Sequence, residues 1–129
     1  MAITEKDVET YLEEAKALIR AGDYRIARNV TRSDNNDLFL EYVISEAEAE
    51  KILLSLSAKD FSEVRRNQKE GYGHEFLYIF GKEVELLERF GSHLVIVPLY
   101  IKLNKIENKI LIVISFHKQK YKLIYCFKD

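Results

Sequence analysis

The chain has 129 residues, a length that fits one domain with a sizeable hydrophobic core. Its single cysteine, Cys126, excludes an intramolecular disulfide and any zinc site built from several cysteines. The net charge of −1 points to no polyanionic partner by itself, but the charge is unevenly spread. Residues 61–129 hold 12 basic and 8 acidic side chains, whereas residues 1–60 hold 8 and 13. This asymmetry favours an anionic ligand for the C-terminal half.

No secretion or membrane signal is visible. The first ten residues lack a basic start followed by an apolar core, and the apolar runs at 94–103 and 110–116 are too short to cross a bilayer as helices. We therefore expect a cytoplasmic protein with no membrane contact. The sequence also suggests no cofactor.

The first half of the chain predicts helices. Thr4 is a typical N-cap residue, and Gly22 is a natural stop for the helix that follows it. The apolar positions of this helix recur every three or four residues: Val8, Tyr11, Leu12, Ala15, Leu18 and Ile19. Residues 24–29 predict a short extended piece or a turn.

Two more helices follow. The first is short and begins at Ser33 or Asp34. The second begins at Ser45, is rich in residues that favour helices, and is expected to bury Ala49, Ile52, Leu53 and Leu56. Ser57 offers another cap ahead of residues 58–61.

From this point the apolar spacing changes to period two. Residues 62–68, 76–80 and 94–103 predict strands, residues 69–75 a glycine-flanked loop, and residues 81–92 a short strand or helix. Pro98 indicates a bulge or an edge position. Helices first and antiparallel strands afterwards predict one α+β domain over residues 1–129, with N-terminal helices packed on one face of a C-terminal antiparallel sheet.

Residues 99–127 predict three antiparallel strands with opposite faces. The first set of alternating positions is apolar: Leu99, Ile101, Leu103, Ile110, Ile112, Ile114, Phe116, Tyr121, Leu123, Tyr125 and Phe127. The second set carries Tyr100, Lys102, Ser115, His117, Lys120 and Lys122. Such alternation is typical of a sheet with one buried and one solvated face. Cys126 is expected to be a buried small hydrophobe.

The turns suggest which residues pair. A two-residue turn at Lys118-Gln119 would pair His117 with Lys120 and Ser115 with Lys122. A longer turn around 104–108 would bring Tyr100 near Val113 and Lys102 near Leu111. The hydrophobic pattern favours these registers, because a slip of one residue would expose apolar side chains.

The polar face carries groups suited to RNA cleavage without a metal. His117 is the best candidate for proton transfer, because an ordinary imidazole titrates near neutrality. Tyr100 and Lys102 lie one pleat apart on the preceding strand, and cationic groups stabilise charge that develops on phosphate. Arg65, Arg66 and the loop residue His74 are further candidates, and Lys118, Lys120 and Lys122 extend the basic surface.

Structural explanations account for the same residues. His117 can be a solvated polar residue beside a turn, Tyr100 a packing residue, and the lysines a charged coat that keeps an exposed sheet soluble. His74 and Glu75 point to opposite sides of an extended segment, so they make a poor metal pair, and we expect no metal site.

Four segments in order resemble the MqsR (motility quorum-sensing regulator) toxins of bacterial type II toxin–antitoxin systems. They are KALIRAG at 16–22, ILLSLSAKDF at 52–61, VPLYIKL at 97–103 and ILIVISFHK at 110–118. Each is short, but together they cover about 100 residues in the family's order.

The resemblance implies a RelE-like α+β fold and a metal-independent endoribonuclease that cleaves mRNA. It also implies a cognate antitoxin, in that family commonly a zinc-binding protein with a helix-turn-helix DNA-binding part. The family's functional strand tyrosine corresponds to Tyr100, and its basic residue after serine-phenylalanine corresponds to His117.

Two family positions have no counterpart here. Ser62 and Glu63 stand where the family has a lysine after aspartate-phenylalanine, and Arg65 is the nearest cation. No residue around 74–77 matches the family's glutamine. The tail at 121–129 would add a last strand that the shortest family members lack.

The sequence leaves three functional hypotheses. The first is an mRNA-cleaving toxin in which His117 is general base or acid, Tyr100 orients the substrate or donates a proton, and Arg65 with Lys102 holds the phosphate. The second is a non-catalytic module that binds nucleic acid or protein through the same face. The third is a structural or regulatory subunit.

Overall fold

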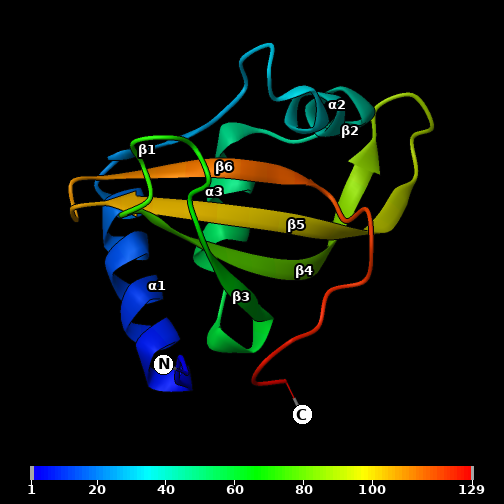
Figure 1. Ribbon diagram of the computed structural model, residues 1–129. Helices are drawn as coiled ribbons and strands as arrows, with labels where there is room; N and C mark the ends of the chain where they lie inside the picture. Colours follow the sequence, from blue (N-terminus) through cyan, green and yellow to red (C-terminus); the bar gives the residue numbers. More distant parts are fainter. Residues whose placement is uncertain (1, 129) are drawn as a thin grey trace.

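The computed structural model describes residues 2–128 and has an α+β architecture (Figure 1). Its helices are α1 (Glu5–Arg20), α2 (Ser33–Glu41), α3 (Glu46–Leu54) and the 3₁₀ turn η1 (Ala58–Asp60). Its strands are β1 (Tyr24–Ile26), β2 (Tyr42–Val43), β3 (Phe61–Arg66), β4 (Phe76–Glu88), β5 (Leu94–Ile106) and β6 (Ile110–Lys118).

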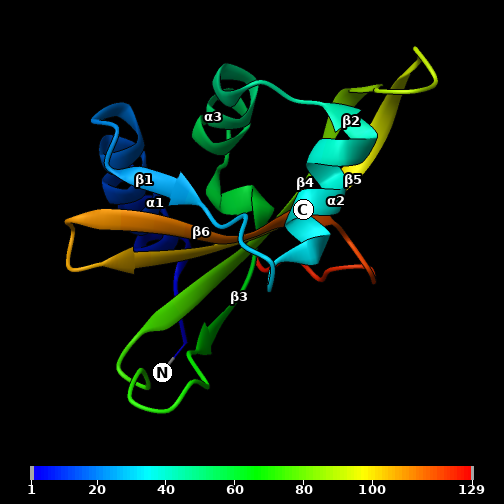
Figure 2. The same cartoon turned by 90° about the horizontal axis from the view of Figure 1, so that it is seen from above.

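All strands belong to one curled sheet in the order β1-β6-β5-β4-β2, and β3 also pairs with β4. Every pairing is antiparallel except that of β1 with β6, which is parallel. Helices α1 and α3 lie on one side of the sheet, and the chain after β6 runs along the other (Figure 2). The predicted class, helices packed on one face of a mostly antiparallel sheet, is confirmed.

The helix starts follow from side-chain caps. The Thr4 hydroxyl accepts the backbone N–H of Asp7, whose carboxylate accepts the N–H of Thr4. Ser45 and Glu48 form the same reciprocal pair at α3. Each pair satisfies two amides that the helix itself leaves without partners. Helix α1 ends where Gly22 adopts a φ of +81°, a conformation that favours glycine.

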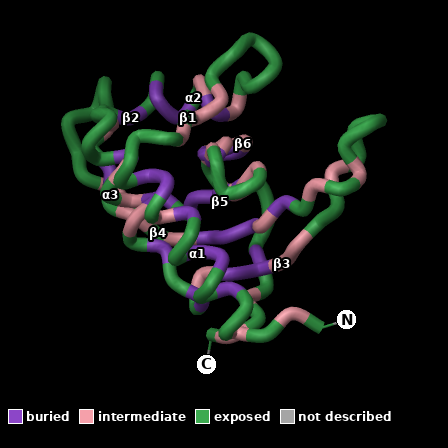
Figure 3. The backbone as a smooth tube through the Cα atoms, turned by 90° about the vertical axis from the view of Figure 1, so that its left-hand side faces the viewer, coloured by how far each residue is buried: buried purple, intermediate pink, exposed green. Residues whose placement is uncertain are grey.

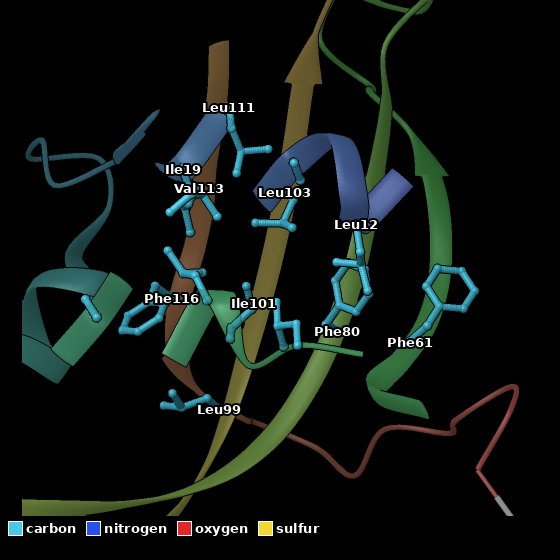
Figure 4. Close-up of a cluster of buried hydrophobic side chains, with 14 of the residues drawn as sticks. Leu12, Ile19, Phe61, Phe80, Leu99, Ile101, Leu103, Leu111, Val113 and Phe116 are labelled. Carbon is cyan, nitrogen blue, oxygen red and sulfur yellow. The ribbon is translucent and has the colours of Figure 1, made fainter. Parts of the chain in front are cut away.

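The core lies between the helices and one face of the central strands (Figure 4). Buried side chains concentrate in the middle of the sheet and on the inner sides of the helices, whereas the loops and the tip of the β4–β5 hairpin are exposed (Figure 3). Buried core residues include Leu12, Ile19, Phe61, Phe80, Leu99, Ile101, Leu103, Leu111, Val113 and Phe116. The other side of the sheet points away from the helices. We call it the open face.

Strand β4 runs through the segment 81–88 whose type the sequence left open. Apolar and polar residues alternate in this segment, so that Val84 and Leu86 both face the helices. This alternation is what a continued strand requires. Pro98 lies on β5 just beyond the last pair with β6, which joins Leu99 to Lys118. This edge position, one of the two that the sequence offered, explains why a residue without an N–H is tolerated.

Strand β6 differs from prediction. The register shifts between the pairs Lys102–Ser115 and Leu103–Val113, so that Ile114 is an extra, bulged residue. Leu111 and Val113 therefore face the helices, and the prediction of Ile110, Ile112 and Ile114 as core residues was wrong. The hairpin turns at Ile106–Lys109, where Glu107 and Asn108 have positive φ, rather than around 104–108.

The predicted last strand is also absent. Residues 119–128, which we call the tail, form an irregular segment that crosses the open face beside β4 and β3. The predicted pairs of His117 with Lys120 and Ser115 with Lys122 do not form. Leu123 is buried, but against Ile79 and Tyr100 of the open face and not in the helix-side core. Cys126 is exposed rather than buried.

Candidate functional site

Tyr100 and His117 face each other across the β5–β6 pair. Their rings stack with centroids 5.2 Å apart and planes only 9° from parallel. The sequence expected Tyr100 beside Val113, so the true register joins the two candidate residues more closely than predicted. Gly81 of β4 is the partner of Tyr100 on its other side. The tyrosine ring therefore stands between a histidine and a residue with no side chain.

The bulge in β6 decides which face His117 occupies. Without an extra residue, the register of the first half of β6 would place Phe116 opposite Tyr100, on the open face, and would turn His117 toward the helices. The bulge at Ile114 reverses the alternation, so that Phe116 enters the core and His117 faces outward.

The side chain of Asn35 holds this bulge in place. Its amide donates to the carbonyl of Ile114 at 2.9 Å and to that of Ala27 at 2.7 Å, and its oxygen accepts the N–H of Phe116 at 2.8 Å. Asn35 is only 1% exposed. It satisfies backbone groups of the bulge that would otherwise be buried without partners.

Two arginines lie within electrostatic range of Lys102, which is one pleat from Tyr100 on β5. Burial lowers the pKa of Lys102, and the neighbouring charges of Arg32 and Arg65 lower it further. Arg65 belongs to β3, Lys102 to β5 and Arg32 to the loop before α2, so the three residues come from distant segments. A half-buried amine that feels the charge of two guanidinium groups favours an anionic ligand.

Glu63 offsets part of this positive charge. Its carboxylate accepts a hydrogen bond from Nε of Arg65, and this bond is the main reason that the pKa of Arg65 is raised. Glu63 pairs with Ile79 on β4, which places it on the open face with Arg65. Glu63, one of the two residues that stand where the resemblance would place a lysine, therefore binds Arg65.

Tyr100 is only 7% exposed, because the tail covers it. The ring of Tyr121 meets it nearly edge-on, with centroids 6.3 Å apart and an angle of 64°. Burial is the main reason that the pKa of Tyr100 rises to about 12, and nearby Tyr121 adds to the rise. The phenol therefore keeps its proton at neutral pH and can act as a hydrogen-bond or proton donor.

The structure does not bring every predicted residue to this place. His74 lines a different cavity, of about 510 Å³, together with Tyr11, Tyr78 and Lys105 from the side of α1. Arg66 lies over the ring of Phe76, 5.5 Å from its centroid. His74 and Arg66 are thus apart from the Tyr100–His117 stack.

The three lysines predicted to bind RNA also lie in different places. Lys118 turns toward the helices, where its Nζ lies 2.9 Å from the Glu41 carboxylate. The Nζ of Lys120 lies 2.6 Å from the Asp34 carboxylate at the start of α2. The pKa of Asp34 is lowered mainly by this hydrogen bond. Lys122 lines a cavity under the tail.

Within residues 2–128, no group of three or more histidine, cysteine or carboxylate side chains is arranged to hold a metal ion. None of the helices in the same range is long and apolar enough to cross a membrane.

No family model, curated protein sequence or solved structure matches the chain significantly. The resemblance to MqsR toxins therefore rests on the sequence motifs alone and stays a prediction.

Three residues of the site were missed by the sequence reasoning. Arg32 sits in a polar loop that offers no periodic signal, and Tyr121 was assigned to the core face of a strand that does not form. Asn35 gave a usable signal, since it lies three residues before the buried Leu38 on the same side of α2. A polar residue at a buried helix position needs hydrogen-bond partners in a neighbouring element.

Proposed function

We propose that the chain is a metal-independent endoribonuclease that cleaves mRNA at the open face and inhibits translation as the toxin of a type II toxin–antitoxin system. The observation that carries the proposal is the stacked Tyr100–His117 pair, with Lys102 one pleat away on β5 and under the electrostatic influence of Arg65 and Arg32. Proton-transfer groups next to an anion site are what metal-free RNA cleavage requires.

In the proposed reaction the 2′-hydroxyl of the RNA attacks the adjacent phosphorus. His117 takes the hydroxyl proton, and the bond from phosphorus to the 5′-oxygen breaks. Tyr100, whose phenol is protonated at neutral pH, donates the proton that the leaving 5′-oxygen needs. The products are a 2′,3′-cyclic phosphate and a 5′-hydroxyl end. Arg65 and Lys102 stabilise the extra negative charge on the phosphorane.

The test is to incubate the purified protein with a long mRNA in EDTA, beside an otherwise identical RNA with 2′-O-methyl groups. The proposal predicts cleavage of the first RNA only, with 5′-hydroxyl ends. Cleavage that needs a divalent ion, or that also occurs in the methylated RNA, contradicts the proposed reaction.

Two histidine variants make the assignment specific. His117→Ala is expected to lower the cleavage rate by about 10²-fold or more, the usual contribution of a general base. His93→Ala is the matched control, because His93 is an exposed residue of the β4–β5 turn whose nearest charged partner is Glu88. Equal loss in both variants points to a general effect on folding and contradicts the role of His117.

A non-catalytic RNA-binding module is the second candidate. The burial of Tyr100 under Tyr121 and Leu123 favours it, because a covered phenol cannot reach a substrate unless the tail moves. Retention of RNA without cleavage, lost as salt concentration rises, is the result that this candidate predicts.

The proposal extends to a partner and a compartment. It includes a cytoplasmic complex with a cognate antitoxin that binds zinc and carries a helix-turn-helix part. A neighbouring gene for such a protein, together with neutralisation of the RNA cleavage by its purified product, supports this extension. Cleavage that persists with the product in excess contradicts it.

A further inference from the structure

The tail is fastened to the sheet at several points. The Ser62 hydroxyl donates to the carbonyl of Ile124 at 2.8 Å, and the N–H of Cys126 donates to the carbonyl of Phe61 at 3.1 Å. Phe127 stacks on the buried ring of Phe61, with centroids 5.9 Å apart. These contacts hold residues 124–127 of the tail on the sheet.

Gly81 allows the tail to come close to β4. A Cβ atom at this position would lie 2.4 Å from the Tyr125 hydroxyl and 2.6 Å from a Leu123 methyl group. Gly81 is also the cross-strand partner of Tyr100. The tail thus meets the sheet one strand away from the proposed reaction centre.

The tail and the sheet enclose a cavity of about 440 Å³, which we call the tail pocket. This volume falls in the range of about 300–1,000 Å³ that is typical of small-ligand sites. Its lining residues are Asp60, Gly81, Lys82, Glu83, Pro98, Gln119, Lys122, Leu123, Tyr125 and Lys128. Leu123 also packs against Tyr100, so this one side chain borders both the tail pocket and the Tyr100–His117 pair.

Three ammonium groups, those of Lys82, Lys122 and Lys128, and two carboxylates, those of Asp60 and Glu83, line the tail pocket. Asp60 is already occupied, since it lies 3.5 Å from Nζ of Lys82 and accepts the backbone N–H of Ser57 at 2.9 Å. Lys122 and Lys128 have no carboxylate partner among the residues that the structure describes. The Nζ of Lys128 lies over the Tyr125 ring, 4.9 Å from its centroid. Two ammonium groups without a carboxylate partner, beside an apolar floor of Pro98 and Leu123, suit a phosphate joined to a less polar group.

We propose that the tail pocket is a second nucleotide subsite. In it, Lys122 and Lys128 bind the phosphate of the RNA nucleotide that flanks the cleaved bond. The proposal rests on the proposed RNA-cleaving function and adds a position where the substrate is held. It also gives the tail a role, because the pocket does not exist without it.

The first experiment needs no catalysis. Adenosine 5′-monophosphate is titrated into the full chain while the backbone amide signals of Gly81, Lys82, Leu123 and Tyr125 are followed by NMR. We expect shifts at these positions that adenosine, which has no phosphate, does not reproduce. In the double variant Lys122→Ala/Lys128→Ala the affinity is expected to fall about tenfold, because charge-assisted hydrogen bonds to the phosphate are lost.

The matched control is Lys109→Ala, which removes an exposed lysine from the distant β5–β6 turn and should bind the nucleotide like the natural chain. Unchanged affinity in the double variant, or shifts confined to other residues, overturns the subsite. Binding that adenosine reproduces overturns the role of the phosphate.

The second experiment separates this inference from the proposed function. In RNA cleavage the double variant is expected to raise KM about tenfold and leave kcat unchanged, since the lysines bind a part of the substrate that does not react. Cleavage with normal KM overturns the subsite while the proposed function stands. No cleavage by the natural chain, together with phosphate-dependent nucleotide binding in the tail pocket, overturns the function and not the site.

Discussion

The side chain of Asn35 bonds to the carbonyl of Ile114, the bulged residue of β6, and to the N–H of Phe116 two residues later. Strand β1 ends at Ile26, so beyond this point β6 has no strand beside it on that edge. The Asn35 amide makes the hydrogen bonds to β6 that a neighbouring strand would otherwise make. By stabilising the bulge, it puts His117 on the same face as Tyr100.

Asn35→Ala is therefore expected to destabilise the protein. It leaves buried backbone groups without partners, and each such group costs about 1–3 kcal/mol. Urea unfolding measures the loss, and Asn36→Ala is the matched control, since Asn36 is exposed and makes one long bond to the carbonyl of Asn29. Equal stability of the two variants would show that the bulge does not depend on Asn35.

Gly81→Ala is expected to loosen the tail. The new methyl group would overlap Tyr125, Leu123 and Gln119, and these side chains must move away. Limited digestion with trypsin, which cuts after Lys120 and Lys122, should become faster. Gly73→Ala is the control, because a Cβ there meets only Arg66 at an ordinary 3.9 Å. A digestion rate that Gly81→Ala leaves unchanged contradicts the close packing of tail and sheet.

Stability should fall at high pH because of Tyr100. The pKa of its phenol is about 12 in the folded chain, against an ordinary value of 10.0. A raised pKa means that the folded state favours the protonated phenol, so this stabilisation is complete below pH 10 and disappears as the pH rises to about 12. Tyr100→Phe should weaken the fall of unfolding free energy in this window, and Tyr72→Phe, in an exposed loop, should not. Identical pH profiles of all three proteins would refute the shift.

Glu63→Gln is expected to strengthen RNA binding. The change frees the Arg65 guanidinium from its carboxylate partner and removes a negative charge from the open face. If Arg65 then gains one phosphate contact, the slope of log K against log salt for single-stranded RNA steepens by about 0.7. Glu70→Gln, in the loop before β4, is the control. Unchanged affinity and slope would place the RNA away from Arg65.

Local signals in the sequence predicted the elements well. The caps at Thr4 and Ser45 and the helical spacing between them depend on residues near in sequence, and each was confirmed. Period-two alternation likewise identified the open face at Tyr100 and Lys102. Such patterns work because they reflect the geometry of a single helix or strand.

The site depended on contacts that no local pattern contains. The bulge at Ile114 needs Asn35, which is 79 residues away in sequence, and a single extra residue reversed the assignment of half of β6. The tail alternates like a strand, but β6 ends at Lys118 and the tail packs across the sheet instead of pairing along it. Its apolar residues therefore cover Tyr100, which alternation alone cannot predict.

The most direct test of the central claim is a double-mutant cycle on RNA cleavage in EDTA. The rates of the natural chain, His117→Ala, Tyr100→Phe and the double variant are compared under single-turnover conditions. If the stacked pair acts as one catalytic unit, each single variant loses about 10²-fold or more and the double variant loses little further. Cleavage by His117→Ala at the rate of the natural chain would contradict the account.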